Sequence, residues 1–210
     1  MAFIKKIQNY ILRRTSYIST IESGKDQQKP IVFLTFDDGP EEGITEFVVD
    51  ELKKYDYHAT FFCRGDNAEK YPQLLSLLIE MGHSIGNHTY SHFHAYETST
   101  GVYVEDVYKA DAILKTKLLR PPYGSLTIWK YIKLKNRFKI FFWSLNSEDS
   151  DMEHFDLVHA IETLKNNTKD GAIVLFHFCH RHEKETRQLL PEYLLWLYQQ
   201  GYQCEAIKYE

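Results

Sequence analysis

The chain has few of the features that mark disulfide scaffolds, membrane proteins or nucleic-acid-binding proteins. Its 210 residues include only three cysteines, and these are widely spaced with no Cys-x-x-Cys motif. This pattern argues against a disulfide framework and against a thiolate zinc site, and it predicts reduced, mostly buried thiols. A formal net charge of −4 without a long Lys/Arg run argues against a nucleic-acid-binding surface.

The N-terminal segment lacks the unbroken apolar core of a signal peptide, and no later stretch approaches the length of a membrane span. Residues 1–20 are basic, and Phe3, Ile7 and Ile11 recur every four residues. A short amphipathic helix that touches an anionic membrane surface is one alternative; a helix packed on its own domain, or a frayed terminus, is the other. We expect a cytoplasmic protein.

The remaining chain alternates between strand-like and helix-like stretches. We expect residues 1–30 to form a basic segment and linker, and residues 31–210 to form one domain. Strands are predicted over 31–36, 57–62, 83–86, 118–119, 138–145, 172–176 and 202–207. Helices are predicted over about 41–55, 71–81, 102–116, 128–134, 155–165 and 184–199. This alternation predicts βα units around a parallel sheet or barrel.

Five polar clusters each follow one of the apolar, strand-like runs. They cover residues 35–40, 88–92, 120–124, 143–149 and 175–177. If the runs are parallel strands of one barrel, their C-terminal ends converge. Two aspartates, three histidines and an arginine would then meet on one face, which is the outline of a metal-hydrolase active site.

Two of these clusters contain candidate metal ligands. His88 and His92 are four residues apart, so on a helical turn both imidazoles would project from one face towards a divalent ion. Such a pair also arises by chance in a chain with ten histidines. Asp37 and Asp38 end an apolar run, where an unpaired buried charge is costly. One could complete a metal site while the other acts as a base; capping of the next helix is the alternative.

In order and spacing, the five clusters resemble the signature of the polysaccharide deacetylases, the NodB-homology domain of carbohydrate esterase family 4, over residues 31–207. The resemblance implies an α/β fold, a distorted (β/α) barrel of about seven parallel strands. It also implies a hydrolase that removes acetyl groups from N-acetylated amino sugars with one divalent metal ion, commonly zinc. Cobalt, nickel or iron suit the same ligands.

The resemblance implies a role for each matching residue. Asp38, His88 and His92 would hold the metal. Asp37 would be the general base, and Arg120 would hold it in place. The backbone N–H of Tyr123 would form part of the oxyanion hole. His177 would be the general acid, and Asp149 would orient it.

The chain departs from the family pattern at three positions. Asn146 stands where the family usually has Asp, Ser150 where it has Trp, and Phe178 where it often has Asp. We therefore expect an active enzyme with an altered pocket. The alternatives are an inactive glycan-binding homologue, a deacetylase of O-acetyl esters, or another C–N bond hydrolase.

The expected partner is a carbohydrate, namely an N-acetylglucosamine-containing polysaccharide, oligosaccharide or glycan precursor, and we expect a monomer. A cytoplasmic location favours a biosynthetic precursor over the mature cell wall. Four other histidines are expected to be structural or surface residues: His83, His94, His180 and His182. Cys179 is noted because it lies two residues after His177.

Overall fold

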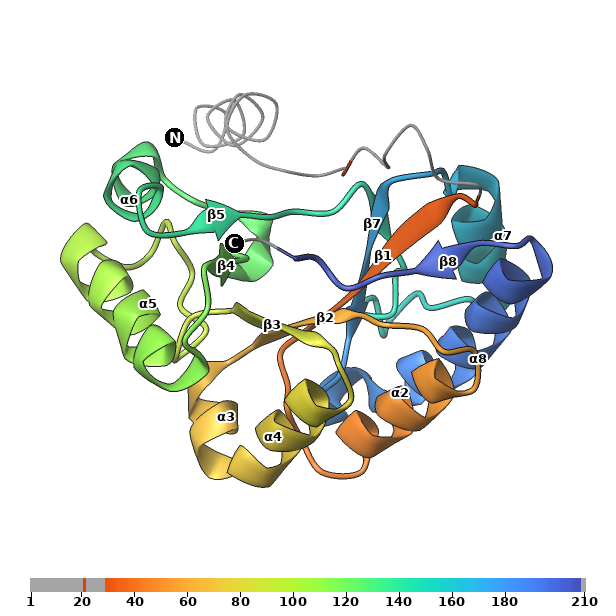
Figure 1. Ribbon diagram of the computed structural model, residues 1–210. Helices are drawn as coiled ribbons and strands as arrows, with labels where there is room; N and C mark the ends of the chain where they lie inside the picture. The colour runs from red at the N-terminus through yellow and green to blue at the C-terminus, as the bar shows by residue number, and fades with distance from the viewer. Residues whose placement is uncertain (1–20, 22–28, 209–210) are drawn as a thin grey trace.

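The computed structural model describes residue 21 and residues 29–208, where strands and helices alternate (Figure 1). The predicted basic segment over residues 1–20 lies outside the described residues. The strands are β1 (Ile31–Asp37), β2 (Thr60–Cys63), β3 (Ser84–Asn87), β4 (Leu118–Leu119), β5 (Lys139–Ile140), β6 (Leu145–Asn146), β7 (Ala172–His177) and β8 (Gln203–Cys204). The helices are α2 (Ile44–Lys53), α3 (Gly65–Lys70), α4 (Pro72–Glu80), α5 (Thr100–Leu114), α6 (Ile128–Leu134), α7 (Leu157–Asn167) and α8 (Glu183–Gln199), with 3-10 turns η1 (Pro122–Gly124) and η2 (His180–His182).

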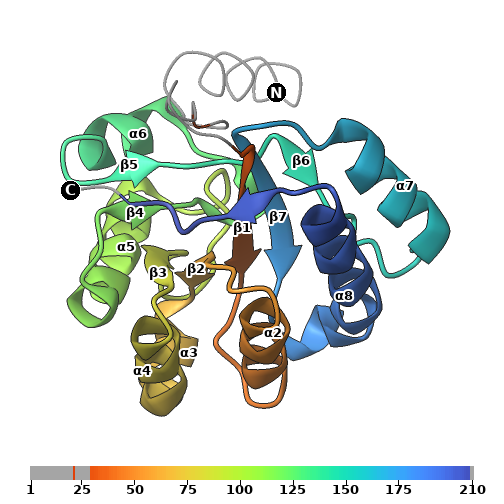
Figure 2. The same cartoon turned by 45° about the vertical axis from the view of Figure 1, so that its right-hand side comes forward.

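The strands form one curved parallel sheet with helices on its outer side. Its order is β5-β4-β3-β2-β1-β7-β6, and β8 pairs with the start of β1. Every strand pairing among the described residues is parallel. Figure 2 shows the helices arranged around the strands. The predicted α/β barrel of parallel strands is therefore confirmed. Among the same residues, no helix has both the length and the apolar character to cross a membrane.

The segment predicted as one strand over residues 138–145 is instead divided into β5 and β6. The Phe141 N–H donates to the carbonyl of Leu119 in β4 at 2.9 Å. Three residues later, the Ser144 N–H donates to the Ile173 carbonyl of β7 at 3.0 Å. A single regular strand cannot pair with both edges of a sheet, so the prediction of one continuous strand was wrong. The chain therefore forms one edge strand of the sheet, β5, and then crosses to the other edge, where it forms β6.

The uniformly apolar sequence of β1 reflects burial on both faces of the strand. Val32, Leu34 and Phe36 pack in the layer between the sheet and the helices. Ile31 and Phe33 pack inside the barrel, in a cluster that also contains residues of β2 and β7. Because successive side chains of a strand alternate, Thr35 and Asp37 continue the interior row towards the C-terminal end.

Helix α3 was missed by the sequence analysis because it has no amphipathic periodicity. Its six residues are mostly polar, and the buried ones are Gly65 and Ala68. A Cβ at Gly65 would lie 3.0 Å from Ala110 of α5, so the close packing of two helices accounts for this glycine. Tertiary contact, rather than local hydrophobic pattern, determines this element.

Gly86 lies where β3 passes directly under the Phe62 ring. A Cβ at this position would overlap the ring, with Phe62 Cε1 at 2.5 Å. We expect Gly86→Ala to lower the free energy of unfolding by about 1–3 kcal/mol through overpacking, measured by urea denaturation. Gly101→Ala is the matched control, because its Cβ meets nothing within 4 Å. Equal stabilities of the two variants would contradict this account of β3.

Candidate active site and metal centre

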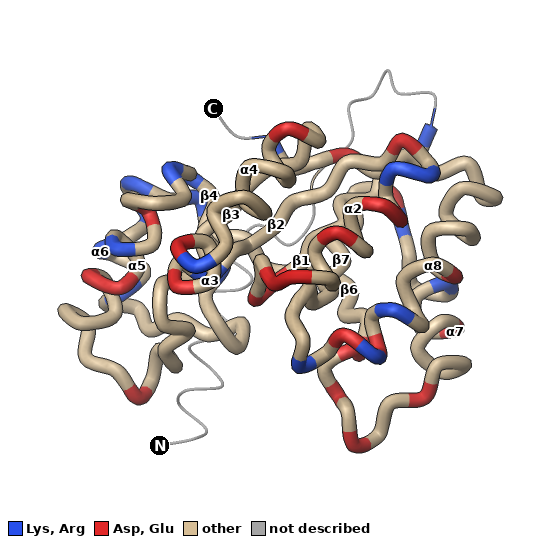
Figure 3. The backbone as a smooth tube through the Cα atoms, turned by 90° about the horizontal axis from the view of Figure 1, so that it is seen from below, with Lys and Arg blue, Asp and Glu red and all other residues tan. Residues whose placement is uncertain are grey.

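The C-terminal ends of the strands converge on one cavity of ≈ 370 Å³. An acidic stretch is visible at the end of β1 in Figure 3, which views the molecule from below. The structure brings six of the predicted site residues to the cavity wall: Asp37, Asp38, His88, His92, Tyr123 and His177. Arg120 and Asp149 are each fully buried and contact this group from behind.

Asp37 is held inside the barrel by Arg120. The Arg120 Nη1 donates to Asp37 Oδ1 at 2.8 Å and to the Thr35 hydroxyl at 2.8 Å. The same guanidinium donates through Nη2 to the Phe142 carbonyl at 3.1 Å and lies 4.1 Å from the centre of the Phe62 ring. The charge of Asp37 is therefore compensated by a buried cation with fixed geometry.

Asp38 reaches the same cavity because its backbone leaves the strand conformation. Its φ of 83° is in the left-handed region, so the alternation that would point Asp37 and Asp38 to opposite faces ends here. Asp38 Oδ1 lies 3.1 Å from His92 Nε2 and 3.5 Å from His88 Nε2. Burial alone would raise the pKa of the Asp38 carboxyl, but the neighbouring histidines, His92 first, hold it well below its usual range.

The two histidines lie in a loop, so the predicted helical turn was wrong. Thr89 and His92 both have left-handed backbone angles, with φ of 63° and 58°, and these turn the loop back on itself. The imidazole rings of His88 and His92 then approach to 5.1 Å between centroids. Asp106 of α5, which the sequence analysis did not identify, stabilises this loop: its carboxylate accepts hydrogen bonds from the N–H groups of Tyr90 and Ser91, each at 2.9 Å.

His88 is oriented by a backbone contact. Its Nδ1 lies 2.7 Å from the Arg120 carbonyl, which makes Nδ1 the protonated nitrogen and leaves Nε2 unprotonated, with its lone pair on the side of Asp38. Burial lowers the pKa of His88 to about 4, so the ring is neutral at physiological pH. A neutral imidazole with one nitrogen held by a carbonyl is the form that binds a metal ion.

The group Asp38, His88 and His92 fits a divalent cation. Its three ligand atoms lie within 4.8 Å of one another. Asp38 Oδ1 is buried and, among the described residues, has no hydrogen-bond partner, although two imidazole nitrogens face it. Two imidazoles and one carboxylate form a donor set that suits zinc and leaves a coordination position open.

His177 and Asp149 form a buried pair across the cavity. The imidazole Nδ1 lies 2.7 Å from Asp149 Oδ1, while Asp149 Oδ2 accepts from the His177 N–H at 2.7 Å and from the Thr186 hydroxyl at 3.1 Å. Burial opposes a positive charge on His177, but the charge and hydrogen bond of Asp149 outweigh it and raise the pKa of His177 to about 9. His177 is therefore protonated at neutral pH.

Tyr123 lies at the mouth of the cavity. Its backbone is left-handed, with φ of 58°, within η1. The residue is 60% exposed, and its ring packs against His92 at 4.7 Å and His94 at 5.0 Å between centroids. His94, expected to be structural or on the surface, thus supports the rim of the site.

The three departures from the family pattern differ in position. Asn146 and Ser150 both line the cavity, as an altered pocket requires. Phe178 is fully buried, and its ring lies 5.0 Å from the Phe61 ring between centroids. It also packs so closely against Gly39 that a Cβ at Gly39 would overlap it. The side chain of Phe178 therefore belongs to the core and does not line the cavity.

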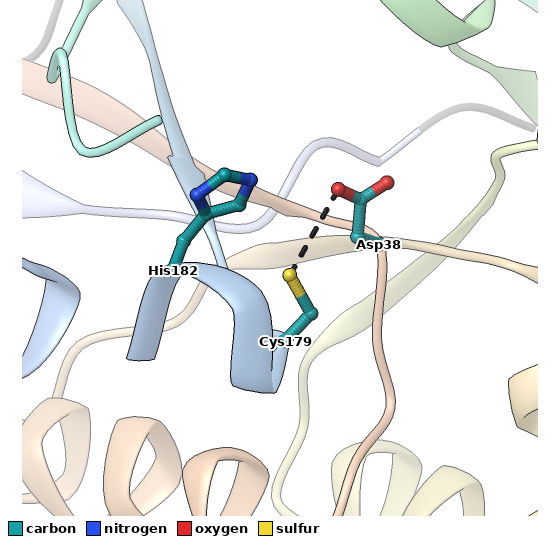
Figure 4. A group of neighbouring side chains, drawn as sticks. All are labelled: Asp38, Cys179 and His182. Atoms are coloured by element: carbon teal, nitrogen blue, oxygen red, sulfur yellow. Dashed lines mark hydrogen bonds between the residues drawn. The ribbon is translucent and has the colours of Figure 1, made fainter. Parts of the chain in front are cut away.

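Two residues after β7 were not placed in the site by the sequence analysis. His182, expected to be structural or on the surface, is 6% exposed, lines the cavity and lies 4.9 Å from the His177 ring. The Cys179 thiol is buried and lies 3.9 Å from Asp38 Oδ2 (Figure 4). Burial, with a further contribution from Asp38, raises the pKa of Cys179 to about 12. The feature of the sequence that pointed to Cys179 was its position two residues after His177. All three cysteines are free and buried, as predicted.

We expect Asp149→Asn to lower the pKa of His177 from about 9 towards or below its ordinary value of 6.5, because the amide removes the charge that favours the imidazolium. The shift is measured by NMR titration of the imidazole signals in the metal-free protein. The raised pKa stabilises the fold fully below pH 6.5, and this contribution is lost as the pH rises through 9. Asp151→Asn is the control, since Asp151 is exposed and contacts His154. An unchanged titration in Asp149→Asn would contradict the assigned electrostatics.

Comparison with known proteins identifies the family of the chain. The family model described as polysaccharide deacetylase matches residues 24–135. The peptidoglycan-N-acetylglucosamine deacetylase of Bacillus cereus is 34% identical over 71% of this chain and 56% of its own length. The peptidoglycan-N-acetylmuramic acid deacetylase PdaC of Bacillus subtilis is 28% identical over 89% of this chain and 40% of its own length. The chain thus spans about half the length of these relatives.

A solved structure extends the agreement to the whole fold. A peptidoglycan N-acetylglucosamine deacetylase, crystallised with an N-hydroxybenzamide compound, superposes with a TM-score of 0.81 at 27% identity. The match covers 93% of this chain and 94% of that one. Sequence and structure therefore agree that the chain belongs to the polysaccharide deacetylase family, the NodB-homology domain of carbohydrate esterase family 4.

Proposed function

We propose that the protein is a metal-dependent hydrolase that removes acetyl groups from N-acetylated amino sugars of a glycan. One observation carries this proposal: two adjacent carboxylates enter one cavity but have different partners. Asp37 is paired with the Arg120 guanidinium, whereas Asp38 faces two imidazoles. This arrangement suits Asp37 to act as a base and Asp38 to bind a metal ion.

The metal would be held by Asp38, His88 and His92. A bound zinc ion would supply Lewis acidity for the acetyl carbonyl and make water a stronger nucleophile near neutral pH. Cobalt, nickel or iron suit the same donors.

Asp37 is proposed as the general base. Its Oδ1 is occupied by Arg120, while Oδ2 points towards the cavity and lies 3.8 Å from His88 Nε2. The ion pair with Arg120 keeps the carboxylate in place as it accepts a proton from the attacking water. The Tyr123 backbone N–H is proposed to stabilise the developing oxyanion, where one donor contributes on the order of 3 kcal/mol.

His177 is proposed as the general acid. Asp149 binds the Nδ1 side of the ring and keeps it protonated, so Nε2 is available to the cavity. Cleavage of the acetamide C–N bond requires a proton on the leaving amine, and the imidazolium can supply it.

The substrate class follows from the relatives. Their names specify peptidoglycan N-acetylglucosamine in one case and N-acetylmuramic acid in the other. We propose an N-acetylglucosamine-containing glycan strand, or a fragment or precursor of one, whose N-acetyl group enters the cavity beside Tyr123. The retained charged residues favour an enzyme over an inactive glycan-binding homologue. The cytoplasmic location and the monomeric state stay predictions.

Metal binding is tested directly by zinc titration calorimetry. We expect His92→Ala to weaken zinc binding at least about 100-fold, because it removes one of three protein ligands. His94→Ala is the control, since its ring also packs against Tyr123 but is not among the ligand groups of the described residues. Equal affinities in the two variants would contradict the assigned ligands.

Catalysis is tested by acetate release from N-acetylglucosamine oligomers, peptidoglycan fragments and O-acetylated sugars. We expect Asp37→Asn to lower kcat about 10²- to 10⁴-fold, because the amide cannot accept the proton. The zinc content of the variant should stay unchanged. The control is Asp151→Asn, on the exposed loop after β6, which should turn over normally. Metal-loaded wild type that releases no acetate from any member of the panel would favour a glycan-binding role, and turnover of O-acetyl esters alone would favour an esterase.

A further inference from the structure

A strongly basic stretch of the chain lies outside the active site. Between Asp111 and Glu148 the sequence contains eight Lys and Arg residues and no Asp or Glu, although the whole chain has a formal net charge of −4. Figure 3 shows Lys and Arg positions gathered beside α6 and β4. Five of these cations line one surface cavity of ≈ 510 Å³, termed the basic cavity: Lys115, Lys117, Lys135, Arg137 and Lys139.

Carboxylates compensate little of the charge around the basic cavity. Arg137 is paired with Asp111, with Nη2 at 2.8 Å from Oδ2. Lys115, Lys117 and Lys135 are exposed and form no ion pair with a carboxylate in the part of the chain that the structure describes. Cations held together on one surface create a positive potential that attracts an anionic partner.

Exposed apolar side chains border the basic cavity. On α6, Trp129 is 69% exposed and Ile132 is 44% exposed. Trp129, Ile132 and Lys135 recur every three residues, so they follow one side of the helix, and Lys135 also lines the cavity. Tryptophan and isoleucine beside lysines form the combination that binds the interface of an anionic membrane, where the indole ring lies at headgroup level.

The basic cavity lies at the end of the barrel to which residues 1–20 are attached. Ile21 packs against an interior cluster that contains Leu118, the residue after Lys117. Residues 1–20 contain four Lys and Arg residues and no Asp or Glu. Because like charges repel, this segment is a poor occupant of the basic cavity, whereas an anionic surface attracts both.

We propose that α6 and the basic cavity dock the protein on an anionic lipid bilayer. Trp129 and Ile132 enter the interfacial layer, and the lysines of the cavity contact anionic headgroups. The basic cavity lies where β4 and β5 begin, whereas the active-site residues follow the ends of the strands, and the two cavities share no lining residue. The docked protein therefore keeps its active-site cavity open. This proposal does not depend on the proposed deacetylase activity.

The test sediments the full-length protein with lipid vesicles. One set of vesicles contains phosphatidylcholine alone, and the other also contains about 30% phosphatidylglycerol. We expect the protein to sediment with the anionic vesicles and not with the neutral ones. Raising the ionic strength from about 0.1 M to about 1 M should weaken this binding, because the Debye length falls from about 10 Å to about 3 Å.

Paired variants locate the contact on the protein. Lys117→Gln combined with Lys135→Gln should weaken binding to anionic vesicles at least about tenfold, because two cations are lost from the docking surface. The matched control is Lys53→Gln combined with Lys184→Gln, which removes two exposed lysines of α2 and α8 and should bind like the wild type.

Trp129→Ala tests the apolar part of the docking surface. We expect it to weaken vesicle binding about tenfold, since the indole ring no longer enters the interface. Val158→Ala is its control, because Val158 of α7 is 68% exposed and lies outside the docking surface. Anionic vesicles should shift the tryptophan emission of the wild type to shorter wavelength, but not that of Trp129→Phe, which retains Trp143 and Trp196.

The proposal is overturned if the wild type does not sediment with anionic vesicles, including the case in which soluble polyphosphate binds instead. Equal binding to neutral vesicles would also overturn it. Binding that the double lysine variant or Trp129→Ala leaves unchanged would assign the contact to another part of the chain and contradict the proposal. Circular dichroism verifies the fold of each variant. Because every readout is lipid binding, these outcomes do not depend on whether the protein deacetylates a glycan.

Discussion

The arrangement of the active site depends on one buried guanidinium inside the barrel. Arg120 follows β4 and contacts β1 through Thr35 and Asp37, while Nη2 reaches the Phe142 carbonyl on the segment that bridges the sheet edges. Its own carbonyl accepts the hydrogen bond that orients His88. Removing one partner of a buried ion pair typically costs 3–5 kcal/mol, because the other charge is left uncompensated. The side chain of Arg120 therefore positions the proposed base, and its backbone positions a proposed metal ligand.

The end of β1 determines how two neighbouring carboxylates acquire different environments. Asp37 keeps the strand conformation and stays in the interior row, where Arg120 binds it. Asp38 adopts a left-handed backbone and turns to the histidines. The peptide link between the two residues fixes the proposed base next to the proposed metal, so proton transfer and carbonyl activation can occur at one acetyl group. Asp149 makes the corresponding contribution on the opposite side, because it keeps His177 protonated.

Much of the fold and most of the candidate site could be predicted from the sequence, because both depend on features that are local in the chain. Apolar runs that end in polar clusters indicated parallel strands whose ends converge, and the order of the clusters identified the family. The errors occurred where tertiary contacts override local pattern. The segment around Phe142 pairs with both sheet edges, left-handed residues replace a helical turn at His92, and His182 is buried by a turn that the sequence did not reveal. Phe178, the first residue after β7, packs in the core between the sheet and the helices.

The central claim is the division of roles between Asp37 and Asp38. The most direct measurement is a crystal structure of the zinc-loaded protein with anomalous diffraction recorded at the zinc edge. The account predicts an anomalous peak bonded to Asp38, His88 and His92, with Asp37 still hydrogen-bonded to Arg120 and outside the coordination shell. A zinc ion bound by Asp37, with Arg120 displaced from the carboxylate, would contradict the account.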